Sequence, residues 1–241
     1  MTTNAARGDG DDTVLAARSI GKQVSSPEGR LAILTDVSLE VRRGESVAIV
    51  GASGAGKSTL LALLAGLDEP TAGSAWLAGH ELTALDEDGR AAVRARHVGF
   101  VFQSFHLVPS LTALENVMLP LELARRPDAR NAAREVLGRV GLAERLGHYP
   151  RQLSGGEQQR VAIARAFVTD PDVLFADEPT GNLDAATGTK IMDLLFGFDG
   201  ARRTTLVLVT HDRSLAARCH REIRLDAGRI VPSSSSPAAA G

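Results

Sequence analysis

The residues from Gly51 to Thr59 have the types and the spacing of a triphosphate-binding loop, because they match the pattern G-x-x-x-x-G-K-[ST] in full. Glycines there permit backbone conformations in which successive N–H groups point inward at phosphate oxygens, and the positive end of a following helix adds its field. Lys57 can then reach the β- and γ-phosphates, and Ser58 can ligate Mg²⁺. The candidate phosphate-binding residues are Gly51, Ala52, Ser53, Gly54, Ala55, Gly56, Lys57, Ser58 and Thr59.

The neighbours of this loop supply the strand–turn–helix context that the pattern requires. The run 46–50 is apolar and β-branched, which is typical of a buried parallel strand, and the leucines of 60–64 fall at helical spacing. An ordinary glycine turn is the alternative interpretation. Lys57 favours the phosphate site, because it is one of only three lysines in a chain that otherwise uses arginine, and a compact ammonium suits phosphate.

Four polar residues stand directly after apolar runs that read as buried strands. Because the carboxyl ends of parallel strands meet at one edge of a sheet, where ligands gather, we expect these side chains to lie together beside the phosphate loop. The residues are Gln103, Asp177, Glu178 and His211, and the strands before them are 98–102, 172–176 and 205–210.

Each of these residues has a predicted role in cleaving a triphosphate. Asp177 is expected to hold Mg²⁺ through its water shell, and Glu178 to act as general base or polariser of the attacking water. Gln103 can bridge Mg²⁺ and that water, and His211 is placed to contact the γ-phosphate. The alternatives are that Asp177 caps the next turn, that Glu178 is a solvated surface acid, and that His211 is only a packed or surface histidine.

A second anion-binding helix end is predicted at Ser154, Gly155, Gly156 and Glu157. Since the chain already holds its own phosphate loop, the economical inference is that this end addresses the γ-phosphate of a nucleotide held by another copy. The same residues form an ordinary capping box, which is true as local structure and does not exclude that role.

Strands alternate with helices along the chain, which predicts an α/β fold of the P-loop NTPase (RecA-like) class with a mainly parallel sheet. We expect the strands 13–24 and 31–41 to form an antiparallel β edge beside the phosphate-loop strand, and 73–82 to form a strand pair. The expected helices are 86–96, 112–123, 128–140, 154–167 and 185–196.

One ATPase domain, 13–231, is expected between two disordered tails, 1–12 and 232–241. Its RecA-like core would consist of 13–103 and 151–231, and the inserted α-helical subdomain of about 104–150.

The composition restricts the possible classes further. A net charge of −2 over 241 residues argues against a sequence-independent grip on nucleic acid. Cys219 is the only cysteine, so no internal disulfide is expected. The stretch 1–10 lacks the apolar core of a secretory signal, and no uncharged apolar run approaches the roughly 20 residues that span a bilayer. If a membrane is involved, another chain must supply the spanning part.

In their order along the chain these motifs resemble those of the ATP-binding cassette (ABC) ATPases, over roughly 15–231. The phosphate loop resembles Walker A, Gln103 the Q-loop and His211 the switch histidine. The stretch 153–157 resembles the family signature, 173–178 Walker B and 182–184 the D-loop.

Within that family, 47–57, 98–109, 111–117 and 176–184 are similar to the lipoprotein-releasing and macrolide-export group, LolD-like and MacB-like, with 161–167, 173–184 and 216–219 closest to its YbbA-like branch. The resemblance implies an ATP-hydrolysing subunit that uses ATP and Mg²⁺ at the cytoplasmic face of the inner membrane. It would drive a separate integral membrane permease acting on lipidic or hydrophobic cargo. It also implies a head-to-tail dimer around two ATP·Mg²⁺, either a homodimer or a pair with a second cassette, and no nucleic-acid partner.

The alternative is a soluble cassette ATPase that acts on nucleic acid or ribosomes. Such proteins usually insert long coiled coils or carry two cassettes in tandem, and this chain has neither a heptad insert nor a repeat.

One position departs from the family pattern. ABC ATPases commonly stack adenine on an aromatic residue of the first strand region, but here no aromatic residue precedes Trp76. By position, Val24 is expected to contact the base. Aliphatic packing would then replace a base–aromatic stack worth about 1–3 kcal/mol, which predicts loose base selectivity.

Overall fold

The computed structural model describes residues 12–26, 29–198 and 204–232. The tails expected at 1–12 and 232–241 therefore lie almost entirely outside the described residues, as do residues 27–28 between the first two strands.

Six strands of the described chain form a core sheet in the order β10-β9-β3-β8-β7-β6. Every neighbouring pair is parallel except β9 with β10. The mainly parallel sheet expected from the sequence is therefore confirmed. The strands are β3 (Ser46–Val50), β6 (Val98–Phe102), β7 (Val173–Asp177), β8 (Thr205–Val209), β9 (Arg221–Asp226) and β10 (Arg229–Val231).

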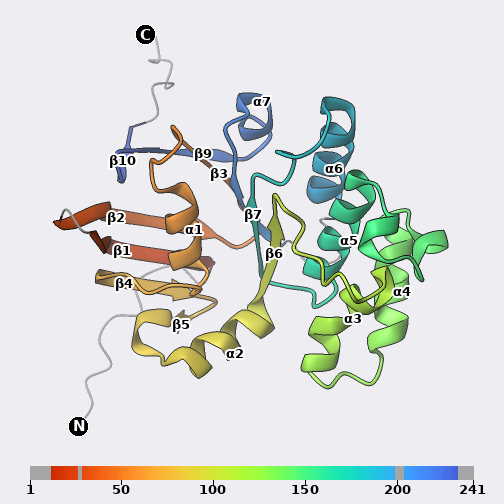
Figure 1. Ribbon diagram of the computed structural model, residues 1–241. Coiled ribbons are helices and arrows are strands. Elements are labelled where there is room, and N and C mark those ends of the chain that lie inside the picture. Colours follow the sequence, from red (N-terminus) through yellow and green to blue (C-terminus); the bar gives the residue numbers. More distant parts are fainter. Residues whose placement is uncertain (1–11, 27–28, 199–203, 233–241) are drawn as a thin grey trace.

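A second, antiparallel sheet of the described residues has the order β2-β1-β4-β5. The expectation that the first two strands lie at the edge next to the phosphate-loop strand is wrong, because β3 pairs with β8 on one side and β9 on the other. Both edges of β3 are thus taken, and the antiparallel strands form their own layer (Figure 1). They are β1 (Thr13–Ser26), β2 (Gly29–Arg42), β4 (Ala72–Leu77) and β5 (His80–Glu81).

Several helices begin where a short polar side chain accepts a hydrogen bond from the first turn, as at Asp86, Thr112, Ser154 and Asp184. No helix in the described ranges is both long and apolar enough to cross a bilayer. The helices are α1 (Lys57–Leu64), α2 (Glu87–His97), α3 (Ala113–Leu123), α4 (Ala129–Arg139), α5 (Gly155–Phe167), α6 (Ala185–Gly197) and α7 (Arg213–Ala216). Short 3₁₀ turns lie at Leu82–Ala84, Ala143–Arg145 and Pro150–Gln152.

The core sheet is covered on both faces, which explains the unbroken apolar run of β7. Val173 and Phe175 pack into a cluster with α1 and the second sheet, whereas Leu174 and Ala176 pack into a cluster with α3 to α6. Figure 1 shows α3 to α6 together on one side and the antiparallel strands with α1 on the other. The carboxyl ends of the parallel strands are left between these two layers.

Candidate functional site

The phosphate loop runs from β3 to α1 and is shaped by glycines that no other residue could replace without rearrangement. A Cβ on Gly51 would lie 2.2 Å from the carbonyl oxygen of Leu225, and Gly56 adopts a left-handed φ of 97° just before α1. Lys57 begins that helix with 8% of its surface exposed, and its Nζ donates to the carbonyls of Gly51 and Ala52 at 3.0 and 2.9 Å. The Lys57 ammonium therefore lies against the same loop that would bind the phosphates.

One pocket of about 620 Å³ brings the predicted strand-end residues and the phosphate loop together. The sequence did not predict Ile33, on β2, which also lines it. The lining residues are Ile33, Gly51, Ser53, Gly54, Gly56, Lys57, Ser58, Thr59, Gln103, Asp177, Glu178 and His211.

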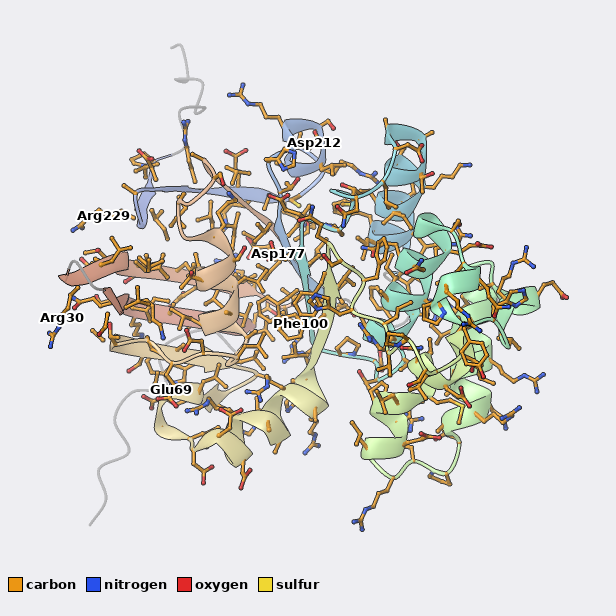
Figure 2. The ribbon with its side chains drawn as sticks, in the orientation of Figure 1. Arg30, Glu69, Phe100, Asp177, Asp212 and Arg229 are labelled. Carbon is orange, nitrogen blue, oxygen red and sulfur yellow. The ribbon has the colours of Figure 1, made fainter. Side chains whose placement is uncertain are left out.

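Asp177 and Ser58 form the part of this pocket that fits a magnesium ion. Burial raises the pKa of the Asp177 carboxyl above its ordinary value, and the charge of Glu178 adds to the rise, while a hydrogen bond from Ser58 and the charge of Lys57 oppose it. Figure 2 places Asp177 near the middle of the molecule, between α1 and the helices α3 to α5. A half-buried carboxylate, a hydroxyl and the amide oxygen of Gln103 around one pocket are the hard oxygen donors that Mg²⁺ prefers.

Glu178 stands at a strained turn directly after β7. Its backbone is left-handed, with a φ of 45°, and its N–H donates to Val209 O at 2.9 Å, which holds the turn against β8. Its Oε2 lies 3.2 Å from Nδ1 of His211, whose side chain is 71% exposed. Such a backbone costs of order 1 kcal/mol or more in a non-glycine residue, and strain of this kind gathers at functional sites. Here the turn aims the carboxylate into the pocket.

Gln103 follows β6 and contacts a residue that the sequence reasoning did not place in the site. Its Nε2 donates to Oδ1 of Asn182 at 3.2 Å, and Nδ2 of Asn182 donates to the Gln103 carbonyl at 3.0 Å. The next turn is also tethered, because the guanidinium of Arg165 on α5 donates to the carbonyls of Phe105 and His106. The only available signal for Asn182 was its position within the stretch that resembles the D-loop.

The helix end at Ser154 has the expected local structure and lies outside the pocket lining. Glu157 N–H donates to Ser154 Oγ at 3.3 Å, and Ser154 N–H donates to Glu157 Oε2 at 2.8 Å, which completes the capping box. The hydrogen bond that Ser154 N–H donates to the Glu157 carboxylate, followed by those from Arg145 and from the Ser154 hydroxyl, lowers the pKa of Glu157 to about 2. The first N–H groups of α5, from Gly155 onward, have no partner inside the helix and can meet an anion.

Three other predicted contacts are also absent from the pocket lining. Ala55 is a buried residue of the phosphate loop, and Ala52 lines a neighbouring hollow together with His211. Val24, the expected base contact, is 39% exposed on β1 and pairs with Leu31 of β2. Ile33 lies two residues further along β2, so the side chains on this flank of the pocket are aliphatic.

This chain is similar in sequence to known ATP-binding proteins. The ABC transporter family model matches residues 34–181. The uncharacterized ABC transporter ATP-binding protein YbbA of Escherichia coli (strain K12) is 56% identical over 221 residues, which cover 91% of this chain and 97% of that protein. The lipoprotein-releasing system ATP-binding protein LolD of Pseudomonas syringae pv. tomato is 51% identical over 223 residues, covering 92% and 98%.

Two solved structures of the ABC transporter cassette MJ0796 are similar in fold. The dimeric cassette has a TM-score of 0.83 and 42% identity, covering 90% of this chain and 96% of that one. The dimeric post-hydrolysis state bound to ADP and Pi has the same TM-score and coverage with 41% identity. The chain therefore belongs to the ABC transporter family, as an ATP-binding subunit that hydrolyses ATP.

Proposed function

We propose that two copies of this chain, or one copy and a second cassette, close head to tail around two ATP·Mg²⁺. Each nucleotide would lie between Gly51–Ser58 of one copy and Ser154–Glu157 of the other. The observation that carries this proposal is that the pocket gathers the phosphate loop with Gln103, Asp177, Glu178 and His211, while the start of α5 is absent from its lining. The dimeric state of the similar cassette MJ0796 supports it.

The residues of the pocket would each have a separate role in ATP binding and hydrolysis. The loop N–H groups and Lys57 bind the phosphates, and Ser58, Gln103 and Asp177 would hold Mg²⁺, which neutralises charge developing on the phosphate oxygens. Glu178 accepts the proton of the attacking water or polarises it, and His211 contacts the γ-phosphate. Dimer closure excludes bulk water from these groups, so that hydrolysis and reopening form a cycle.

The cycle would drive a separate membrane-spanning permease from the cytoplasmic face of the inner membrane, where this chain is peripheral. The residues of about 104–150, with α3 and α4, would form a helical subdomain that meets the permease. The lipoprotein-releasing system named for the LolD relative supports a lipidic or hydrophobic substrate that is extracted or exported. Purification from a membrane fraction together with a multi-span protein supports this assignment, whereas purification with nucleic acid or ribosomes contradicts it.

The dimer is tested with Glu178→Gln, which keeps the shape of the side chain but removes the base. This variant should bind ATP·Mg²⁺ without hydrolysing it and should elute as a dimer in size-exclusion chromatography with ATP. It should elute as a monomer with ADP. Hydrolysis at the parental rate would remove Glu178 from its role.

Two further substitutions, each made in the Glu178→Gln variant, test the two halves of the proposed site separately. Lys57→Ala should abolish both nucleotide binding and the dimer. Gly155→Asp should leave binding of ATP to the chain's own pocket intact but prevent the dimer, because its carboxylate would repel a γ-phosphate at the start of α5. An added Cβ at Gly155 meets no atom closer than 3.5 Å, and an acidic residue suits a helix N-terminus, so this variant should fold. An ATP-induced dimer of the Gly155→Asp chain would refute the head-to-tail arrangement.

A further inference from the structure

Asn182 lies in the segment between β7 and α6, and its amide pairs with two different groups of Gln103. Its Nδ2 is 3.0 Å from the backbone oxygen of Gln103, and its Oδ1 is 3.2 Å from the side-chain Nε2 of the same residue. Asn182 is itself exposed, and Gln103 is half-buried in the pocket lining. The pair therefore joins the surface segment to the pocket.

The chemistry of these two contacts fixes which atom of each amide faces which partner. A backbone carbonyl can only accept a hydrogen bond, so the Asn182 atom next to it must be the donor Nδ2. Oδ1 of Asn182 then faces the Gln103 side chain, and an acceptor oxygen requires a donor, which is Nε2. Oε1 of Gln103 is consequently the end of that amide that stays available for the pocket.

The backbone at Gly181 and the buried side chain of Gln159 both support the contact between Gln103 and Asn182. A Cβ on Gly181 would lie 2.7 Å from Gln103 Nε2, so the Gln103 side chain lies directly against the backbone of the neighbouring residue. Gln159 of α5 is fully buried, and its Nε2 lies 2.6 Å from Pro179 O and 3.5 Å from Phe102 O. The buried amide of Gln159 thus links Phe102, the residue before Gln103, to the segment between β7 and α6 that carries Asn182.

We propose that Asn182 is the positioning residue of Gln103, because it keeps Oε1 rather than Nε2 turned toward the place of Mg²⁺ and the attacking water. This inference rests on the proposed function of Gln103. A hard cation takes oxygen ligands, and an amide turned the other way would present N–H groups to it. Without Asn182 the Gln103 amide loses the hydrogen bond that fixes its orientation, and it can flip.

The test measures Mg²⁺ binding rather than turnover. Fluorescence of mant-ATP bound to the full chain is followed while Mg²⁺ is titrated, and the readout is the Mg²⁺ concentration at half-maximal change. Asn182→Ala should raise this concentration about fivefold, the effect expected from losing a typical hydrogen bond. Asn131→Ala, the same substitution at an exposed site on α4, should leave it unchanged. An unchanged midpoint for Asn182→Ala would overturn the inference.

A double-mutant cycle separates this inference from the proposed function. Gln103→Ala should itself raise the Mg²⁺ midpoint, and in that background Asn182→Ala should add less than about twofold, since interacting residues are not additive. A Gln103→Ala chain with the parental midpoint would remove Gln103 from the metal site and so refute the proposed function there. An equal effect of Asn182→Ala in both backgrounds would refute only the positioning role. Asn182→Leu, similar in size but without either polar atom, should behave as Asn182→Ala does and provides the second variant if the first is unstable.

Discussion

Asp177 carries a negative charge in a half-buried place that has little to offset it until a cation arrives. Burial is the largest cause of its raised pKa, and Lys57 and Ser58 only partly oppose it. In the nucleotide-free chain the ionised Asp177 carboxylate therefore lowers the stability of the folded state. The same property makes it a good ligand, because a bound cation offsets the remaining cost of burying the charge.

Asp177→Asn should separate stability from metal binding. At pH 7 the neutral amide avoids burial of a charge, so the thermal unfolding midpoint of the nucleotide-free chain should rise by about 2–4 °C. The variant should also lose the extra stabilisation that ATP with Mg²⁺ gives over ATP with EDTA. Circular dichroism melting curves with and without EDTA measure both effects. A lower midpoint without nucleotide would show that the carboxylate already has a stabilising partner.

We expect the aliphatic flank of the pocket to determine base selectivity. Val24 is exposed and Ile33 lines the pocket, and neither side chain offers an aromatic ring to a base. We expect GTP to displace mant-ATP with an inhibition constant within about threefold of that of ATP, because the stack worth roughly 1–3 kcal/mol is missing. Val24→Tyr should tighten ATP binding. A strong preference of the parental chain for ATP would contradict this prediction.

At the scale of elements, the sequence predicted the central strands and the helix starts because their signals are local. The apolar run of β7 followed by two carboxylates, and Ser154 followed by Glu157, reveal their structure within a few residues. The strand β9 was not predicted, although Ile223 and Leu225 alternate with charged residues, because the run is short and flanked by arginines. Its place beside β3 is what put the antiparallel strands into a separate sheet.

The site was predictable where it depends on sheet topology and not where it depends on loop conformation. Parallel strands must end at one edge, so Gln103, Asp177 and His211 were expected together. The pairing of Gln103 with Asn182, and the approach of Ile33 from the other sheet, follow from the paths of loops and from packing between layers. No pattern in the sequence encodes those distances.

The start of α5 should show a pH-dependent stability through Glu157. Its pKa in the folded state is about 2, below the ordinary 4.5, so its stabilising contribution is present above pH 4.5 and is lost as the pH falls toward 2. Glu157→Gln should lower the thermal midpoint at pH 7 by about 2–4 °C, since Gln can still complete the capping box but loses the charge-assisted part of the hydrogen bonds from Ser154 and Arg145, worth on the order of 1 kcal/mol. The difference from the parental chain should shrink below pH 4.5. Glu135→Gln, at an exposed site on α4, is the control and should not change the midpoint.

For the whole molecule, the proposed arrangement makes activity a property of pairs. If each active centre needs residues from two copies, ATPase activity per chain should rise with protein concentration until dimers dominate at saturating ATP, as mass action requires. A dilution series from about 0.1 to 50 µM, assayed for phosphate release, covers the range expected for a transient dimer. Constant activity per chain with a monomer by light scattering would contradict the shared centre.

The helix α5 begins at the Ser154 cap, and its own side chains Gln159 and Arg165 grip the backbone on either side of Gln103. The proposed arrangement would place the N-terminus of α5 at the nucleotide of a neighbouring copy, while its side chains hold the segment around Gln103 of its own chain. A displacement of the N-terminus of α5 should therefore also displace the segment around Gln103. Nucleotide binding across the proposed interface would then be coupled to the chain's own active centre through the movement of α5 alone.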